Sequence, residues 1–197
     1  MNKLFLFMIV SCLALDLSAQ DIQLPAPQKT GGKPLMEAIS LRQSNRYFSD
    51  KDLDLQTISN LAWVAYGFNR EGMRVVPSAN NKQGFEIYLT LQSGVYQYDA
   101  KANKLILKVS GDHRKIAGKQ DFVSIAPLNF IYVMNKEISN VAVDCGFIAQ
   151  NVYLYCASEG LAVVVRGFFD QDEIKKTLNL DDKKEVVLCQ TVGYINK

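Results

Sequence analysis

The chain has 197 residues, of which 48% are hydrophobic and 21% are charged. This composition is typical of a globular protein rather than a disordered one, and the length fits a single domain. The formal net charge of +2 is too small to predict binding to nucleic acid or to an anionic membrane, and no nucleic-acid-binding motif stands out.

Residues 1–19 have the pattern of a secretory signal peptide. Lys3 gives a basic start, an apolar run extends from Leu4 to Leu15, and the small residues Ser18-Ala19 follow. The apolar run is too short to form a stable membrane anchor. We therefore expect cleavage after Ala19 and export to the periplasm. Two alternatives stay open: a lipoprotein box in "IVSC", anchored through Cys12, and a buried N-terminal helix.

Residues 20–33 are rich in Pro and Gly and predict an extended linker before a single domain at 34–197. A first helix is expected from Pro34 to Leu41, because proline suits an opening turn. A second helix fits 53–68, where apolar residues recur at helical spacing. The polar stretch that follows it, up to residue 84, predicts a long loop, and long loops in compact domains are often functional.

Alternating and apolar runs dominate the rest of the chain. We expect strands at 85–92, at 126–135, at 162–169 and at 183–195, a hairpin at 94–111, and helices from Asp112, at 140–161 and at 170–180. The 140–161 helix is apolar almost all round, so it should be central and buried. This order predicts an α+β fold, with a mostly antiparallel sheet packed between helices.

Little points to metal or hydrolytic chemistry. Three scattered cysteines follow residue 19, at 145, 156 and 189, and they form no disulfide framework. His113 is the only histidine, so we expect no metal site. A hydrolase would have to combine His113 with Cys145 or Ser44. That alternative ranks last, because His113 lies in a polar, turn-like stretch.

The stretch "RQSNRYF" carries three anion-binding groups, Arg42, Ser44 and Arg46. The planar guanidinium group of arginine matches the geometry of a phosphate, and serine adds a hydroxyl donor. In an extended segment, alternation would send all three side chains to one side. Taken alone, however, the stretch reads more simply as a solvated loop.

A second polar stretch is "VVPSANNKQGF". Pro77 and Ser78 begin a rigid turn, and the amides of Asn81 and Gln83 can each donate and accept. Such amides can contact the heteroatom edge of a ring system. Alone, this is ordinary turn composition.

In order and spacing, the two stretches together resemble the FMN-dependent nitroreductase family. "RxSxR" is similar to that family's phosphate- and ribityl-contacting segment, and "PSxxNxQ" is similar to its flavin-ring loop. "ASEGLAVVVRGFFDQDEIKKTLNL" and the final "TVGYI" extend the resemblance, which covers roughly Leu35 to Ile195. "DHRKIAGKQDFVSIAPLNFIYV" and "DCGFIAQNVYLY" look most like the branch of SagB-type dehydrogenases, which oxidise azoline rings in peptides.

The resemblance implies a nitroreductase-like homodimer, with FMN at an interface formed largely by the helix from Ala142 to Ser158. The first motif would hold the phosphate, the ribityl chain and the N1–O2 edge, and the second would meet the ring from the other side. Val165, Arg166 and Gly167 would lie near the isoalloxazine. Family members typically pass a hydride through flavin N5 from NAD(P)H, or here another donor, to a nitroaromatic or quinone. The SagB-type branch would instead dehydrogenate an azoline-like substrate.

Three departures from the family pattern leave a second function open. Many members carry an acidic residue where this chain has Arg166, which could either stabilise reduced flavin or simply pair with Glu159. The "PW" that often follows the glutamine is Gly84-Phe85 here, and only Lys197 could replace a basic C-terminal extension. The alternative is a non-catalytic exported protein of this fold that binds a different small anionic ligand.

Overall fold

A computed structural model describes residues 20–138 and 141–196. The predicted signal peptide, with the alternative lipid anchor Cys12, lies outside the described residues, and so does Lys197. In the described part of the chain, no helix is both long and apolar enough to cross a membrane.

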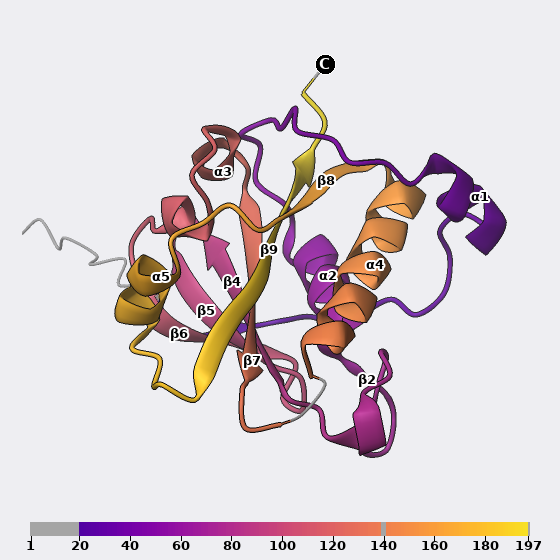
Figure 1. Ribbon diagram of the computed structural model, residues 1–197. Coiled ribbons are helices and arrows are strands. Elements are labelled where there is room, and N and C mark those ends of the chain that lie inside the picture. Colours follow the sequence, from indigo (N-terminus) through magenta and orange to yellow (C-terminus); the bar gives the residue numbers. More distant parts are fainter. Residues whose placement is uncertain (1–19, 139–140, 197) are drawn as a thin grey trace, which may run out of the picture.

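A seven-stranded sheet forms the centre of the fold (Figure 1). Its order is β1-β6-β5-β4-β7-β9-β8, and every neighbouring pair is antiparallel. The strands are β1 (Ile22–Gln23), β4 (Phe85–Leu91), β5 (Gly94–Asp99), β6 (Lys104–Ser110), β7 (Leu128–Asn135), β8 (Leu161–Arg166) and β9 (Lys184–Tyr194). The predicted α+β fold with a mostly antiparallel sheet is confirmed.

Helices cover both faces of this sheet (Figure 1). On one face lie α2 (Leu55–Tyr66) and α4 (Val141–Glu159), which bury a large core with the strands. On the other lie the short helices η2 (Arg114–Ala117) and α3 (Phe122–Ile125), together with α5 (Gln171–Leu178). A further helix, α1 (Leu35–Leu41), packs beside α4 and buries only Ala38.

Local sequence signals explain where several helices begin and end. The Asp54 side chain accepts a hydrogen bond from the backbone N–H of Thr57 at 2.7 Å, which caps the start of α2. Asp170 caps α5 in the same way, and α5 ends where Asn179 adopts a left-handed conformation with φ 50°. Asparagine tolerates that conformation better than most residues, so the helix stops there.

Two segments hold more structure than the sequence predicts. Residues 20–33 run in an extended form, but β1 adds to the sheet edge beside β6. The expected loop up to residue 84 contains a hairpin of β2 (Phe68–Arg70) and β3 (Met73–Arg74) and the short helix η1 (Ala79–Asn81). Strands of two or three residues are too short to show an alternating pattern, which explains why they were missed.

The helix α4 is buried along one side only. Val152 and Cys156 are fully buried, whereas Val143 is 66% exposed and Phe147 is 44% exposed. Gly146 and Gln150 share that exposed side, since they lie one helical turn from these residues. The apolar face that made the helix look central is therefore partly uncovered in the single chain.

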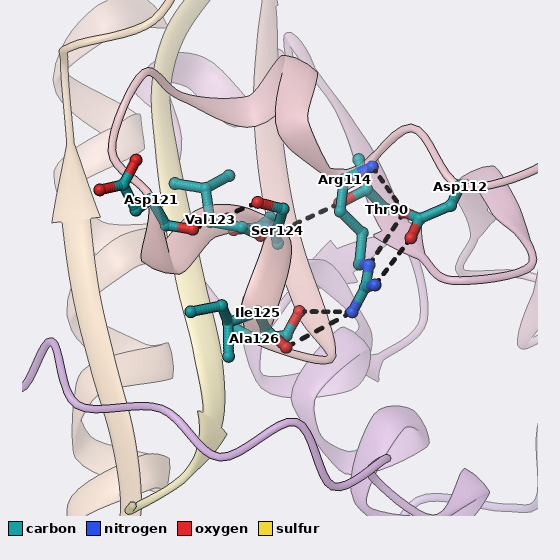
Figure 2. Close-up of polar contacts among 9 residues, drawn as sticks. Thr90, Asp112, Arg114, Asp121, Val123, Ser124, Ile125 and Ala126 are labelled. Carbon is teal, nitrogen blue, oxygen red and sulfur yellow. Dashed lines mark hydrogen bonds and ion pairs between the residues drawn. The ribbon is translucent and has the colours of Figure 1, made fainter.

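Arg114 fastens the segment before α3 to the end of that helix (Figure 2). Its Nη2 contacts the Asp112 carboxylate at 2.7 Å, and its Nη1 donates to the Ala126 carbonyl at 3.1 Å. The guanidinium hydrogen bond is the main reason that the pKa of Asp112 lies below its ordinary value of 3.8.

Replacing Arg114 by methionine is expected to lower the free energy of unfolding near neutral pH by about 1–2 kcal/mol, the usual net worth of a few exposed charge-assisted bonds. A carboxyl with a lowered folded-state pKa contributes stability above its unfolded pKa, and this is lost as the pH falls through the folded pKa. The difference from wild type should therefore shrink below the ordinary pKa of 3.8. Urea unfolding at neutral and acidic pH measures it, with Lys115→Met as control; an unchanged difference contradicts the ion-pair account.

Candidate functional site

The segment from Arg42 to Arg46 runs along the free edge of β8 (Figure 1). The backbone N–H of Asn45 donates to the carbonyl of Val163 at 2.9 Å, which fixes the segment against that strand. Gln43 and Asn45 line a small recess against β8 and α4. Arg42 and Ser44 instead contact α4 through Tyr153.

Tyr153 joins three elements at this point. Its hydroxyl lies 2.8 Å from Ser44 Oγ and accepts a hydrogen bond from the backbone N–H of Val165 at 2.9 Å. The Arg42 guanidinium lies over its ring, 5.4 Å from the centroid. Because Tyr153 can donate to Ser44, the Ser44 hydroxyl is free to donate outward. The sequence pattern places Tyr153 in an apolar helix, and only its phenolic hydroxyl indicates such a polar role.

Replacing Tyr153 by phenylalanine is expected to lower the free energy of unfolding by about 1–2 kcal/mol, because the Val165 N–H loses its partner in a buried place. Chemical denaturation measures the change. Tyr47→Phe is the matched control, since Tyr47 is 76% exposed and should change stability little. Equal stability of the two variants would contradict the bridging role of Tyr153.

The two arginines of the segment form no ion pair with any residue that the structure describes. Among the residues that the structure describes, no carboxylate lies within ion-pair distance of Arg42 or Arg46. Arg42 is half-buried, and Arg46 and Ser44 are exposed. Two uncompensated cations beside an oriented hydroxyl fit a phosphate group well.

The loop from Ser78 to Gln83 is held by its own side chains. Ser78 Oγ accepts from the Gln83 backbone N–H at 3.1 Å, and the Gln83 amide donates to Asn81 Oδ1 at 2.8 Å. Both amides also donate to the carbonyl of Gly72, at 2.6 and 3.2 Å. Pro77 is exposed at the start of the loop. The amides predicted to contact a ring are thus engaged in shaping the loop.

The backbone of this loop is strained. Asn80, Asn81 and Gln83 all have positive φ, between 50° and 54°. That region is uncommon for residues other than glycine, and such strain gathers at binding sites and tight turns. The side-chain bonds of Asn81 and Gln83 stabilise the conformation.

Arg74 stabilises the loop through a hydrogen bond to Gln83, a role that the sequence did not predict. Its Nε donates to Gln83 Oε1 at 2.9 Å, and its Nη1 donates to the Tyr66 carbonyl at 2.8 Å. The guanidinium also lies over the rings of Tyr66 and Phe68, 4.2 and 4.0 Å from their centroids. In the sequence, only the closeness of Arg74 to the aromatic residues Tyr66 and Phe68 indicates this role.

Within one chain, the arginine segment and the loop meet different parts of α4. Ser44 contacts Tyr153, whereas Tyr66, next to the loop, lies near Asp144. Burial and, less strongly, the Asp144 charge raise the pKa of the Tyr66 phenol. Tyr153 lies about 13 Å further along the helix axis than Asp144, at about 1.5 Å per residue.

At the end of β8, the backbone at Gly167 is exposed, whereas the Arg166 side chain is buried. Gly167 is exposed, and an added Cβ there would meet nothing within 4 Å. Val165 lies on the α4 side, where its N–H meets Tyr153. Arg166 points to the opposite face, 5.8 Å over the Phe122 ring, so it does not pair with Glu159.

Arg166 is the centre of a buried polar cluster that crosses the sheet. It donates to the Ala117 carbonyl at 2.7 Å, to Asn129 Oδ1 at 3.2 Å and to Thr191 Oγ1 at 2.6 Å. Asn129 in turn donates to Thr90 Oγ1 at 3.2 Å, so β4, β7, β9 and β8 are linked. Burial lowers the pKa of Arg166, and no carboxylate offsets its charge in the described residues.

The hydrolase alternative finds no support in the geometry. Cys145 lies on the buried face of α4, where burial raises the pKa of its thiol to about 12. His113 lies beyond the sheet, with Nε2 3.2 Å from the Ser110 carbonyl. In residues 20–138 and 141–196, no group of three His, Cys, Asp or Glu side chains is placed to hold a metal ion.

Solved structures of nitroreductases share this fold. The chain matches a structure described as a nitroreductase of Ralstonia eutropha JMP134 with a TM-score of 0.85 and 37% identity, covering 93% of each chain. An FMN-dependent nitroreductase of Clostridium difficile R20291 matches with a TM-score of 0.60 and 17% identity, over 82% of this chain and 88% of that one. The fold is therefore of the nitroreductase class.

Sequence comparison gives the family. The model of the nitroreductase family matches residues 39–194. A protein described as a nitroreductase of Methanocaldococcus jannaschii is 30% identical over 194 residues, which covers 88% of this chain and 96% of the relative. The chain belongs to the nitroreductase family, a family of oxidoreductases.

Proposed function

We propose that the protein is an exported, FMN-dependent oxidoreductase that acts as a homodimer. The observation that carries the proposal is a pair of arginines with no acidic partner in residues 20–138 and 141–196, next to a serine hydroxyl oriented by Tyr153. Arg42, Ser44 and Arg46 would hold the phosphate and ribityl chain. When bound, FMN supplies hydride transfer through its N5 atom.

The chain's own residues bind and orient this group. The open end of β8 at Gly167 leaves room for a flat ring beside exposed backbone. The strained loop from Ser78 to Gln83 presents a fixed surface, since Arg74 and the loop's own amides hold its shape. Polar backbone groups held near a flavin ring tune the electronic properties of the ring, and this needs no titrating acid or base.

A dimer would bring the separated parts together. Val143 and Phe147 are exposed apolar residues of α4, and Leu35 and Met36 of α1, the helix that packs beside it, are 63% and 75% exposed. A two-fold axis across the middle of this face makes the two α4 helices antiparallel. The partner's loop would then lie near the Tyr153 end of α4 in this chain, so that each FMN contacts both chains.

The choice of electron donor and substrate depends on the export of the protein. Free NAD(P)H is scarce outside the cytoplasm, so an exported enzyme needs another donor or a dehydrogenation in the opposite direction. We therefore infer a SagB-type branch, acting on azoline-like rings, ahead of NAD(P)H-driven reduction of nitroaromatics or quinones. The segments 112–133 and 144–155 carry this inference through their resemblance to that branch.

Flavin content tests the proposal. Protein purified from its own cell envelope should be yellow and release about one FMN per chain, as expected of a resident cofactor. Protein that stays colourless and does not bind added FMN would overturn it. Mass spectrometry of the same sample should show Gln20 as the first residue; intact Met1 would contradict export.

One observation favours the second function, a non-catalytic protein of this fold that binds another small anion. The amides of Asn81 and Gln83 are already bonded within their loop and to Gly72. A relative of this kind would still bind phosphate through Arg42 and Ser44 but would purify without flavin. Binding of inorganic phosphate by colourless protein would therefore select it.

A further inference from the structure

A second cavity is lined by residues of the β2–β3 hairpin and of β4, β5 and β6. Its volume is about 310 Å³, within the usual range for small-molecule sites. Its walls include the rings of Tyr66, Phe68 and Tyr98 and the cationic side chains of Arg74 and Lys101. The cavity is therefore lined by aromatic rings and by two cationic side chains.

Arg74 is built into this wall in a fixed position. Two of its nitrogens bond to Gln83 and to the Tyr66 carbonyl, and its plane is stacked on the Tyr66 and Phe68 rings. The third, Nη2, makes no hydrogen bond to any described residue. No carboxylate of the described residues pairs with Arg74, and burial lowers the pKa of its guanidinium. A half-buried cation of this kind favours an anionic ligand.

Two acidic residues, Glu86 and Asp99, also line the cavity. The Glu86 carboxylate pairs with Lys184 on the other side of β4. The Asp99 carboxylate accepts from the backbone N–H groups of Lys101 and Ala102, at 2.8 and 3.1 Å. The Asp99 carboxylate keeps its charge and acts on Arg74. The Lys101 ammonium has no acidic partner among the described residues, so the two cations Arg74 and Lys101 exceed the Asp99 charge by one.

A neighbouring recess extends the positive surface. Its volume is about 580 Å³, and it shares Phe68 and Lys101 with the cavity. Lys29 and Arg70 line it, with Glu71 as its one acidic side chain. A ligand in the cavity would therefore rest against aromatic rings and place its charge among several cations.

We propose that this cavity binds a small aromatic anion, a ring of about benzene size that bears a carboxylate or phosphate group. Arginine and lysine recognise either anion, and the aromatic walls bury the ring. The site is separate from the proposed FMN site and requires neither FMN nor catalysis. Arg74 also supports Gln83, so an occupant would contact the residue that shapes the Ser78–Gln83 loop.

Isothermal titration of the full chain with matched probes tests the charge and the ring separately. Benzoate and phenyl phosphate carry both features, benzamide keeps the ring without the charge, and acetate keeps the charge without the ring. The proposal expects benzoate or phenyl phosphate to bind at least about tenfold more tightly than either control, as a charge-assisted bond predicts. Whichever of benzoate and phenyl phosphate binds more tightly identifies the anionic group, carboxylate or phosphate, that the cavity prefers. Equal binding of benzoate and benzamide, or no binding of either anion, overturns the proposal.

Variants then place the site. Arg74→Gln should weaken binding of the tighter anion about tenfold or more, since it removes a charged donor. Ala100→Leu should block binding by filling the cavity, while leaving Arg74 in place. The exposed control Lys176→Ala should bind as wild type. Binding that survives both Arg74→Gln and Ala100→Leu overturns the assignment.

A last comparison separates this site from the flavin site. Protein saturated with FMN, and the Arg42→Ala variant, should both bind the anion as the untreated wild type does. If FMN displaces the anion, or if Arg42→Ala abolishes its binding, the anion occupies the flavin site and the separate cavity site is wrong. If the protein binds no FMN but binds the anion through Arg74, the proposed function fails and the cavity site stands.

Discussion

Replacing Arg42 by alanine is expected to weaken FMN binding by about 10- to 100-fold, the usual effect of losing a charged hydrogen bond to phosphate. Arg42 is half-buried and has no acidic partner among the described residues, so its charge is available to a ligand. Stability should change little, because the side chain contacts the protein mainly through the Tyr153 ring. Quenching of FMN fluorescence on titration measures the affinity.

The neighbouring exposed residue supplies the control. Gln43→Ala alters the side of the segment that faces β8, so it should leave FMN affinity within about twofold of wild type. Arg42→Lys should recover part of the affinity, since it restores the charge without the planar fork. If Arg42→Ala and Gln43→Ala bind FMN equally well, the segment does not hold the phosphate.

Replacing Gly118 by alanine is expected to destabilise the protein by about 2–3 kcal/mol, as overpacking of a fixed site does. An added Cβ would lie 1.8 Å from Nη1 of Arg166 and 2.9 Å from Oε1 of Gln120. Arg166 is only 6% exposed and donates to four acceptors, so it cannot move aside without losing bonds. Thermal or urea unfolding measures the loss.

Gly167→Ala is the matched control, because an added Cβ there meets nothing within 4 Å and stability should be close to wild type. Arg166→Leu removes the clash but leaves the Ala117 carbonyl and Thr191 Oγ1 without their donor, so it should itself cost about 3 kcal/mol. The double variant of Gly118 and Arg166 should then lose less stability than the sum of the two single losses. Strict additivity would show that Gly118 and Arg166 are not in contact.

The sequence predicts most of this fold because its long elements carry strong periodic patterns. The helix α4 and the strands β7 and β9 are long enough for the pattern of burial to identify them. The predicted helices at 53–68 and 170–180 match α2 and α5, and the structure shows Asp54 and Asp170 as their caps. The strand β1 escapes prediction because two residues cannot show a period, and its pairing depends on β6, far along the chain.

The candidate site is predicted less completely, because its contacts join distant segments. Strand alternation places Arg166 on the same face as Val164, but the sequence cannot say which face carries a ligand. The pairing of Tyr153 with Ser44, and of Arg74 with Gln83, depends on how helices and loops meet in space. Residue types pointed to the arginine segment and the loop, whereas their supports emerged only from tertiary contacts.

The central claim is an FMN site shared between two chains, one giving Arg42 and Ser44 and the other giving the Ser78–Gln83 loop. Co-expressed chains with two different tags allow a mixed dimer to be isolated, with Arg42→Ala in one chain and Gln83→Ala in the other. Each variant alone should bind FMN weakly, because every site in its dimer carries the change. The mixed dimer has one site that is wild type and one that carries both changes.

The measurement is the flavin content of that mixed dimer after removal of free FMN. A site built from both chains predicts about one tightly bound FMN per mixed dimer, with wild-type affinity, since one of its two symmetric sites is intact. A mixed dimer that binds no more FMN than the separate variants would contradict the shared site.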